Sequence, residues 1–392
     1  MAMEKKKFLI VNIGSASKKY AFYEDGRRML FAHFEHEGEK ILLELQSDKG
    51  KEQRTLNNVG FDNVLSLFLH EIKMRGHVKE ALDIDAFGVR VVAPGTFFSK
   101  SVKIDSDYIH KLNKAAKLVP LHLSPLLKEL EMLRRDYPTV PIVAVSDSEF
   151  HQDMNEVAQV YAINAEETNN LDLRRFGFHG LSVSSAVSIT SELNGSALDK
   201  VVVCHLGGGS SVTAVRKSRS VDTSMGYTPL EGVPMATRVG NIDAGAVLVL
   251  AREMGIDECE AYLNSKCGLL GVSGTSPDIR DLIRLQGEGD KQAEKALDIF
   301  VYSIRKYVGA YAAVLGGLDA IIFSGTVGER SDIIRERIAS DFQWLGAELD
   351  KEKNVKQSDY SRFINTSRSK VKIAVVYSDE MDEIAKKCER LF

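Results

Sequence analysis

The chain has 392 residues, enough for two or three domains that each bury a core of their own. Hydrophobic residues make up 44% of it and charged residues 27%, which excludes a disordered chain, a fibre and a disulfide-rich scaffold. The net charge of −4 offers no basic face for nucleic acid, so we expect small-molecule ligands and no nucleic-acid partner.

The cysteines and the apolar runs indicate a compartment. The four cysteines lack the spacing of a zinc site or of a secreted scaffold, which suits a reducing cytoplasm. The apolar run 8–11 ends at Asn12, too short for a signal peptide, and therefore predicts a strand. The longest nearly uncharged stretch, 307–318, is well below the roughly 20 residues of a membrane span. We expect a cytoplasmic protein with no membrane partner.

Two hairpins dominate the strand pattern. Residues 8–23 predict a strand, a Gly/Ser turn at Gly14 and a second strand. Residues 201–215 repeat this pattern around Gly207–Gly209. Two such hairpins about 190 residues apart predict a duplicated α/β fold, with related halves facing each other across a cleft.

Helices are predicted between the strands. Ser124 and Pro125 are typical of an N-cap and a first helical residue, and this helix should end before Pro138. Apolar residues repeat every three to four positions from 297 to 315 and stop at a glycine pair, which predicts one long amphipathic helix.

The sequence after that helix predicts a nucleotide-facing corner. A buried strand at 320–323 is followed by a small-residue turn at 324–328 and by a helix from Ser331 through Leu345. The polar segment 350–370 is expected to be a surface loop or an exposed helix, without chemistry.

Three glycine turns are candidate phosphate sites: Gly14-Ser15, Gly207–Gly209 and Gly325–Gly328. Backbone N–H groups approach phosphate closely there because no side chain intervenes, and three turns together suggest a polyphosphate. Each turn alone is also compatible with an ordinary hairpin or loop. None fits a P-loop or a dinucleotide-binding fingerprint, so both are disfavoured.

Charged residues stand at several strand ends. Arg90 and Arg238 lie among apolar or small residues, so they could clamp a carboxylate and a phosphate, or form structural ion pairs. Asp147 and Glu380 each follow an apolar strand, and such carboxylates suit Mg²⁺, although a solvated surface role is the simpler interpretation of Glu380. His179 lies among small residues and is a candidate for catalysis or for a structural role.

Four stretches carry a family resemblance: Asp222–Gly232 (DTSMGYTPLEG), 174–180 (RRFGFHG), 147–152 (DSEFHQ) and 268–274 (GLLGVSG). Through them the chain resembles the acetate kinases of the acetate and sugar kinase, actin and Hsp70 superfamily, from Phe8 to the C-terminus. The resemblance implies a duplicated actin-like (ribonuclease H-like) fold with two domains around a nucleotide cleft. The expected domains are 1–148 plus 381–392, and 149–380 with most of the nucleotide site.

The implied activity is reversible transfer of the γ-phosphoryl group of ATP to acetate, giving acetyl phosphate and ADP. The implied cofactor is Mg²⁺, with Mn²⁺ as an alternative, and the implied assembly is a homodimer. Because acetate is already ionised at pH 7, a general base is barely needed.

The resemblance also carries site residues over, position by position. The implied catalytic residues are Arg90, Asp147, His179 and Arg238. Acetate would meet Arg90, Asn12 and His122, with a methyl pocket of Val92, Leu121, Phe178 and Pro229. The phosphates and adenosine would meet Ser15, Ser17, Lys19, His205, Gly207, Gly208, Gly209, Asp278, Arg280, Gly325, Gly328 and Glu329. The metal would be organised by Asn12, Asp147 and Glu380.

The chain departs from the family pattern in a few places. Val89, Ala93-Pro94, Gly208, Asn241 and Arg330 stand where the family usually has His, His-Gly, Asn, Asp and Asn. These departures keep open a propionate or butyrate kinase, a pyrophosphate-dependent relative, and a nucleotide-binding pseudoenzyme of the same fold.

Overall fold

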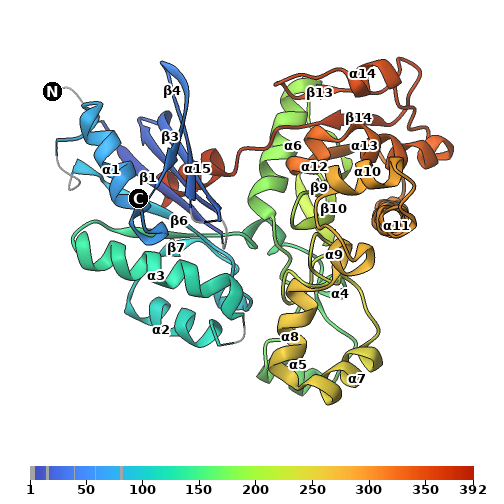
Figure 1. The fold of residues 1–392 in the computed structure, drawn as a ribbon, viewed down its shortest axis with the longest axis horizontal. Helices are drawn as coiled ribbons and strands as arrows, with labels where there is room; N and C mark the ends of the chain where they lie inside the picture. Colours follow the sequence, from blue (N-terminus) through green and yellow to red (C-terminus); the bar gives the residue numbers. More distant parts are fainter. Residues whose placement is uncertain (1–4, 15–16, 39, 58, 80–82, 118) are drawn as a thin grey trace. The chain divides into compact units, whose positions relative to one another are not determined.

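The computed structural model describes residues 5–392 except 15–16, 39, 58, 80–82 and 118, and leaves out the side chains of residues 37 and 120–122. The chain divides into two compact units, whose helices and strands are labelled in Figure 1. Unit 1 consists of Met1–Glu149 and Glu380–Phe392, and unit 2 of Phe150–Asp379. None of the helices in the described ranges is both long and apolar enough to cross a membrane.

Unit 1 is built on a mixed sheet. Its strands are β1 (Lys7–Ile13), β2 (Ser17–Glu24), β3 (Arg27–Glu37), β4 (Lys40–Ser47), β5 (Gly50–Leu56), β6 (Ala86–Val91), β7 (Val102–Lys103) and β8 (Ile142–Ser146). Its helices are α1 (Val64–Met74), α2 (Ser106–Ala115), α3 (Pro120–Asp136) and α15 (Glu380–Leu391), with short 3₁₀ turns η1 (Phe61–Asn63) and η3 (Thr96–Phe98). The 3₁₀ turn η4 (Glu149–His151) spans the boundary between the two units. The strand order is β5-β4-β3-β2-β1-β6-β8-β7.

Successive side chains along the strands of unit 1 point to opposite faces of the sheet, and helices cover both faces. Leu9 and Phe22 belong to the core that also takes up apolar residues of α1, α2 and α3. Phe8, one position from Leu9, stacks edge-on against Phe392 beyond α15, at a ring distance of 5.7 Å. A β-carbon on Gly88 would lie 3.1 Å from Cβ of Cys388, so the glycine lets α15 pack closely on β6.

Unit 2 contains a second sheet. Its strands are β9 (Lys200–Leu206), β10 (Ser210–Arg216), β11 (Arg219–Thr223), β12 (Ala320–Ser324), β13 (Arg362–Phe363) and β14 (Lys372–Val375), in the order β11-β10-β9-β12-β14-β13. Its helices are α4 (Glu156–Gln159), α5 (Ala165–Asn170), α6 (Gly180–Asn194), α7 (Ala244–Met254), α8 (Ile256–Ser265), α9 (Gly268–Ser273), α10 (Ile279–Gly287), α11 (Lys291–Leu315), α12 (Gly325–Arg330), α13 (Asp332–Ala339) and α14 (Lys351–Val355), with a 3₁₀ turn η5 (Ser340–Leu345).

The two sheets share one topology. In unit 1, β1 pairs antiparallel with β2 and parallel with β6, which pairs parallel with β8. In unit 2, β9 pairs antiparallel with β10 and parallel with β12, which pairs parallel with β14. Both hairpins predicted from the sequence are therefore confirmed, and each opens the same arrangement of strands.

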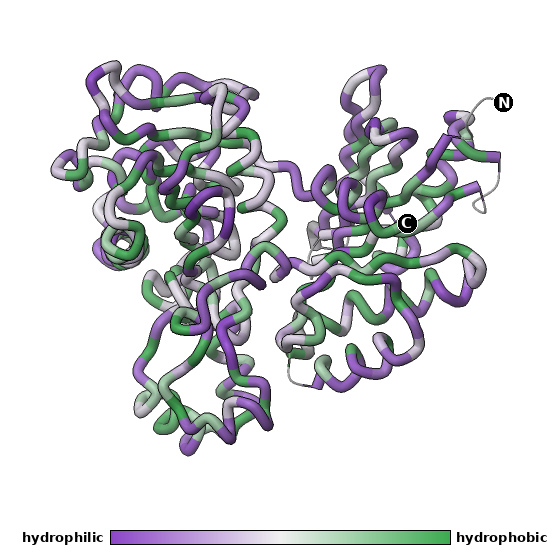
Figure 2. The backbone as a smooth tube through the Cα atoms, turned by 180° about the vertical axis from the view of Figure 1, so that it is seen from behind, coloured by the Kyte–Doolittle hydropathy of each residue, from purple (hydrophilic) through white to green (hydrophobic). Residues whose placement is uncertain are grey.

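Both predicted helices are confirmed, but each begins earlier in the chain than predicted. Helix α11 ends where predicted, because Gly316 adopts a left-handed backbone with φ of +67°. In Figure 2 this helix is seen nearly end-on, with both hydrophilic and hydrophobic residues in its turns. The start expected at Ser124-Pro125 is wrong, since α3 begins at Pro120 and contains Pro125. A proline at the first helical position needs no intrahelical N–H bond, so Pro120 serves that position instead.

The corner after β12 also differs from its prediction. The strand is confirmed, but residues 325–330 form the short helix α12 rather than a turn. Ser331 caps α13 through the N–H of Ile334, and the helix expected to continue through Leu345 gives way to η5.

Candidate active site

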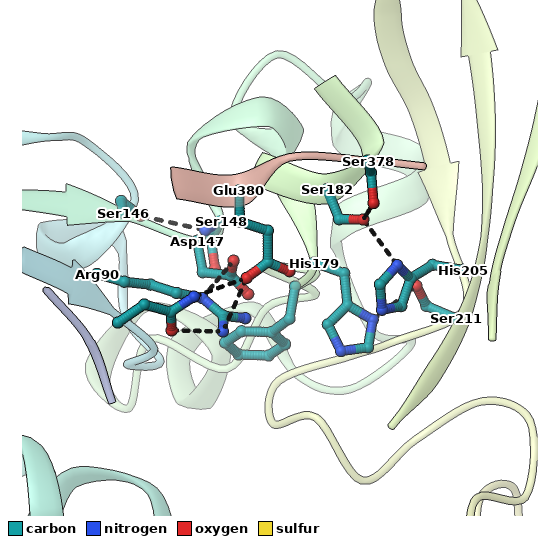
Figure 3. Close-up of polar contacts among 12 residues, drawn as sticks. Arg90, Ser146, Asp147, Ser148, His179, Ser182, His205, Ser211, Ser378 and Glu380 are labelled. Atoms are coloured by element: carbon teal, nitrogen blue, oxygen red, sulfur yellow. Dashed lines mark hydrogen bonds and ion pairs between the residues drawn. The ribbon is translucent and has the colours of Figure 1, made fainter. Parts of the chain in front are cut away.

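Four of the predicted side chains meet in unit 1 around Arg90 (Figure 3). Arg90 Nε donates to Asp147 Oδ1 at 3.0 Å, and Nη1 donates to Asn12 Oδ1 at 3.2 Å. Arg90 Nη1 also lies 3.4 Å from Glu380 Oε2, which accepts a hydrogen bond from Asn12 Nδ2 at 2.9 Å. The cluster therefore forms a closed set of polar contacts.

Sheet topology explains why distant residues gather here. Asn12 and Arg90 lie near the ends of β1 and β6, and Asp147 directly follows β8. Because these three strands are parallel neighbours, their carboxyl ends lie at one edge of the sheet. Glu380 opens α15, and its carboxylate is only 21% exposed. The solvated surface role considered for Glu380 is therefore wrong, because Arg90 and Asn12 hold it in place.

The charges in this cluster are shielded from water. The side chain of Asp147 is fully buried, and that of Arg90 is 17% exposed. Burial alone lowers the pKa of Arg90, but the charges of Asp147 and Glu380 outweigh it and hold that pKa above its usual value. Arg90 is thus a fixed cation, with Nε and Nη1 engaged by its neighbours.

The two lysines of β2 lie on opposite faces of the sheet. Lys19 stands opposite Asn12 in the β1–β2 ladder, so the two residues share a face. Lys18 lies on the other face, buried, where its Nζ is 2.7 Å from Glu129 Oε2. Ser17 closes the hairpin by accepting from the N–H of Gly14 at 2.8 Å. The predicted phosphate residue Ser15 lies outside the described residues.

The predicted acetate pocket remains a prediction. Val92 follows β6 and is half-buried, while Phe178 and Pro229 of unit 2 are buried. The side chains of Leu121 and His122 lie outside the described part of the chain.

His179 is held in an unusual backbone conformation in unit 2. It immediately precedes α6 with φ of +60°, a left-handed value that is uncommon for a residue other than glycine. Its Nδ1 lies 3.0 Å from Ser211 Oγ, and its ring lies 4.4 Å from the ring of His205. His205 Nδ1 in turn lies 2.7 Å from Ser182 Oγ, as Figure 3 shows. The two histidine rings therefore lie side by side, and each is held by a hydrogen bond to a serine hydroxyl.

The glycine hairpin lies beside His179 and Arg238. A β-carbon on Gly209 would be 3.2 Å from His179 Nε2 and 3.5 Å from Arg238 Nη1. The predicted residues His179, Gly209 and Arg238 are therefore close together. At Gly208 a β-carbon would have no heavy atom within 4 Å, so this position has room for a side chain.

The predicted glycine segment at Gly325–Gly328 lies beside the glycine hairpin at Gly207–Gly209. Because β9 and β12 are neighbours, a β-carbon on Gly207 would lie 3.9 Å from the nitrogen of Thr326. Gly325 has φ of +75°, and a β-carbon there would come within 2.6 Å of Leu206 O, so only glycine fits. Glu329 accepts from the N–H of Gly325 at 3.2 Å. The structure thus brings these predicted nucleotide residues together.

The predicted adenosine pair has a simpler structural role. Asp278 caps α10 by accepting from the N–H of Arg280 at 2.8 Å. The Arg280 side chain is 87% exposed and pairs with Asp278 at 2.5 Å, which lowers the pKa of Asp278. Nucleotide binding by this pair remains a prediction.

Known proteins match this chain along nearly its whole length. Residues 7–386 match the model of the Acetokinase family. The chain belongs to the acetokinase family. The acetate kinase of Caldicellulosiruptor saccharolyticus is 37% identical over 405 residues, covering 98% of this chain and 99% of its own. The acetate kinase of Caldanaerobacter subterraneus subsp. tengcongensis is 39% identical over 398 residues, covering 98% of both chains.

Solved structures agree with this assignment. The propionate kinase of Francisella tularensis has a TM-score of 0.88 at 32% identity and covers 99% of this chain and 100% of its own. The acetate kinase of Porphyromonas gingivalis has a TM-score of 0.84 at 32% identity, with 98% and 99% covered. This acetokinase family member therefore has a duplicated α/β fold and is a phosphotransferase, as the resemblance implied.

Two departures from the acetokinase pattern have a structural account. Asn241 accepts from the N–H of Gly232 at 3.0 Å and donates to the Tyr307 hydroxyl at 2.8 Å, so it holds a loop together. Arg330 is exposed at the end of α12. Ala93 and Pro94 are buried after β6, and nothing in the structure explains why they replace the usual residues.

Sequence reasoning missed a buried arginine behind the nucleotide corner. Arg335 is 2% exposed and donates to the carbonyls of Gly328 and Glu329 at 3.0 and 2.8 Å. Its Nε donates to Asn354 Oδ1 at 2.8 Å, and burial lowers the pKa of Arg335 to about 10. The segment 350–370 is mostly exposed and contains the short helix α14, as expected, but Asn354 within it is buried against Arg335. The available signal was an arginine directly after the apolar Ile334.

The Arg90 cluster offers the donors of a cation site. Among the described residues, no three His, Cys, Asp or Glu side chains are grouped to hold a metal ion. Asp147, Glu380 and Asn12 nevertheless offer carboxylate and amide oxygens, the donors that Mg²⁺ prefers. The donor chemistry fits Mg²⁺, with Arg90 close to the same oxygens.

Proposed function

We propose that this acetokinase transfers the γ-phosphoryl group of ATP reversibly to acetate, giving acetyl phosphate and ADP. The observation that carries the proposal is the fixed Arg90 cation, whose Nε and Nη1 are engaged by Asp147, Asn12 and Glu380. A guanidinium held in this way binds a carboxylate without losing side-chain entropy at the moment of binding. Acetate needs no deprotonation, so positioning and charge stabilisation are the main requirements.

The groups of unit 2 would act on the phosphates. Arg238 and the supported His179 would stabilise charge that develops on the transferring phosphoryl group. The adjacent glycine segments at Gly207 and Gly325 would present backbone N–H groups to the remaining phosphates. Asp147, Glu380 and Asn12 would organise Mg²⁺, which supplies charge neutralisation when bound.

The proposal extends to the domains, the compartment and the assembly of the protein. We propose that units 1 and 2 are its two actin-like domains, with most of the nucleotide site in unit 2, and that the protein is cytoplasmic. The lobe of unit 2 around α4, α5, α7 and α8 exposes large apolar side chains. These include Val157 (87%), Leu171 (60%), Leu248 (56%) and Ile256 (78%). Such a surface supports the proposal of a homodimer.

A hydroxamate assay tests the proposed reaction. Acetate, propionate and butyrate are each combined with ATP, GTP and pyrophosphate in the presence of Mg²⁺, and acyl phosphate is trapped and measured. Acetate with ATP should give the highest rate. Product with pyrophosphate but not with ATP would indicate a pyrophosphate-dependent relative. The absence of product with every pair would indicate a nucleotide-binding pseudoenzyme.

Acid preference is predicted from the proposed methyl pocket. An added methylene gains about 0.8 kcal/mol if it fits, but overpacking costs about 1 to 3 kcal/mol. Since no pocket residue is glycine or alanine, the clash should dominate, with kcat/KM for butyrate roughly ten- to a hundredfold below acetate and propionate between them. Measuring kcat/KM for the three acids decides the matter. A value for butyrate at or above that for acetate would contradict the prediction.

Gly208 is predicted to weaken the hold on ATP. An asparagine there would supply one hydrogen bond to a charged phosphate, worth about 1.5 to 3 kcal/mol. Because the position has room for a side chain, Gly208→Asn should lower KM for ATP, by up to ten- to a hundredfold if the whole bond is regained. Gly208→Ala is the matched control, since it adds bulk without an amide. Equal KM values for wild type and the Asn variant would refute this interpretation of the hairpin.

A further inference from the structure

The loop Gly226–Gly232, here called the Pro229 loop, holds the side chain of Arg238. Arg238 Nη1 donates to the carbonyl oxygen of Pro229 at 3.1 Å. The backbone of Arg238 is fixed separately, because its carbonyl accepts from the N–H of Met235 at 3.0 Å. Nη1 also lies 3.5 Å from Met235 Sδ, so the direction of the guanidinium depends on the Pro229 loop together with Met235.

Backbone hydrogen bonds hold both ends of that loop, since Gly226 O accepts from the N–H groups of Phe176 and Gly177 and Gly232 O accepts from the N–H of Asn241. Within the loop, the carboxylate of Glu231 makes two further contacts. Glu231 Oε1 accepts from Arg175 Nη2 at 2.7 Å, and Oε2 accepts from the Tyr161 hydroxyl at 2.6 Å. The same hydroxyl accepts from the N–H of Tyr227 at 2.9 Å, so Tyr161 joins two points of the loop. The side chains of Glu231 and Arg175 are 33% and 17% exposed, which leaves limited competition from water.

Arg175 connects this loop to its surroundings. Its Nη1 lies 3.2 to 3.4 Å from the carbonyl oxygens of Thr223, Ser224 and Met225, at the end of β11. Arg175 also stands only four residues before His179 in the chain. A lysine could not reproduce these contacts, because it lacks the planar fork of donors.

The carboxylate of Glu231 packs against the backbone of Gly226. A β-carbon on Gly226 would lie 1.8 Å from Glu231 Oε2 and 2.2 Å from the Tyr161 hydroxyl, so the acid packs directly against glycine backbone. The far end of the loop is fastened by Asn241, whose Oδ1 accepts from the N–H of Gly232. The loop is thus held at both ends, with Pro229 between them.

We propose that Glu231, held by Arg175 and Tyr161, is a positioning residue that aims Arg238 through the carbonyl of Pro229. The inference rests on the proposed function, since it takes Arg238 as the group that stabilises the transferring phosphoryl. Glu231 itself touches no reacting atom. When its charge is removed, the loop relaxes and Arg238 loses its fixed direction, which affects the transition state more than nucleotide binding.

Glu231→Gln and Tyr161→Phe test the proposal. Glu231→Gln should lower kcat about tenfold and Tyr161→Phe about threefold, each with KM for ATP within twofold of wild type. Glu258→Gln is the matched control, because Glu258 forms an exposed ion pair with Lys266 in the same unit. A purely structural role would lower the melting temperature and leave kcat unchanged well below it, and that outcome overturns the proposal.

A double-mutant cycle asks whether Glu231 acts through Arg238. In the Arg238→Ala background, Glu231→Gln should have almost no further effect on kcat. If Glu231→Gln lowers kcat in the Arg238→Ala background by the same factor as in wild type, the proposal is overturned. If Glu231→Gln does not fold, Tyr161→Phe replaces it, and an unchanged kcat in that variant overturns the proposal.

A crystal structure of Glu231→Gln separates this inference from the proposed function. If wild type shows no transfer activity, the proposed function fails, but the distance between Pro229 O and Arg238 Nη1 can still be compared. Retention of the 3.1 Å contact in the variant would overturn the positioning role whatever the activity. Loss of that contact supports it.

Discussion

Replacing Arg90 by alanine is expected to lower kcat/KM for acetyl phosphate formation by about 100-fold or more, which corresponds to about 2.7 kcal/mol of transition-state stabilisation. The variant removes the proposed carboxylate contact and leaves the buried Asp147 and the half-buried Glu380 without their cation. Steady-state kinetics with varied acetate measures the effect.

Two further variants make the Arg90 result interpretable. Arg135→Ala is the control, because Arg135 is 71% exposed and pairs with its neighbour Asp136. Arg90→Lys keeps the charge but cannot reach Asp147 and Asn12 with separate donors, so it should recover only part of the activity. A thermal melt shows whether Arg90→Ala remains folded. Activity within a few-fold of wild type in a folded Arg90→Ala variant would remove Arg90 from the site.

Arg238→Ala should cause a loss of similar size, again about 100-fold or more in kcat/KM, because it removes a cation proposed to stabilise the phosphoryl group. Folding should be less affected than in Arg90→Ala, since the backbone hydrogen bond between Arg238 and Met235 is retained and the side chain bonds the Pro229 carbonyl. Initial rates with ATP and acetate measure this loss.

The control for Arg238 is Arg284→Ala, which removes an exposed arginine paired with Glu288 in the same unit. It should behave like wild type. An Arg238→Ala variant that retains acetyl phosphate formation within a few-fold of wild type would remove Arg238 from the proposed phosphoryl site, since no uncharged methyl group can replace a guanidinium there.

Local patterns predicted much of the fold. The two hairpins and the end of α11 depend on residues next to one another, namely apolar alternation and glycines that adopt positive φ. The start of α3 at Pro120 was missed because Ser124-Pro125 offered a competing local signal, and the helical form of residues 325–330 was missed because the glycines there favour a turn. Arg335 binds carbonyls at the end of α12 and is itself held by Asn354, 19 residues further along the chain, a contact that local propensity does not encode.

The site was predicted unevenly for the same reason. Residues at strand ends could be found, since parallel strands bring Asn12, Arg90 and Asp147 to one edge. Glu231 and Arg175 lie inside motifs that carried the resemblance, yet their pairing is a contact across 56 positions that no local pattern encodes. The partner of a charged residue is decided by the fold, so a sequence alone left both the structural ion pair and the ligand clamp open for Arg90.

Helix α15 has a consequence for the order in which the protein matures. It contributes Glu380 to the Arg90 cluster and packs on β1, β6 and β8, although unit 2 separates it from those strands in the chain. During synthesis at roughly 5 to 20 residues per second, residues 150–379 take about 10 to 50 seconds to emerge. Throughout that time the nascent sheet of unit 1 lacks one of its covering helices, and its exposed apolar face is a natural substrate for chaperones on the ribosome.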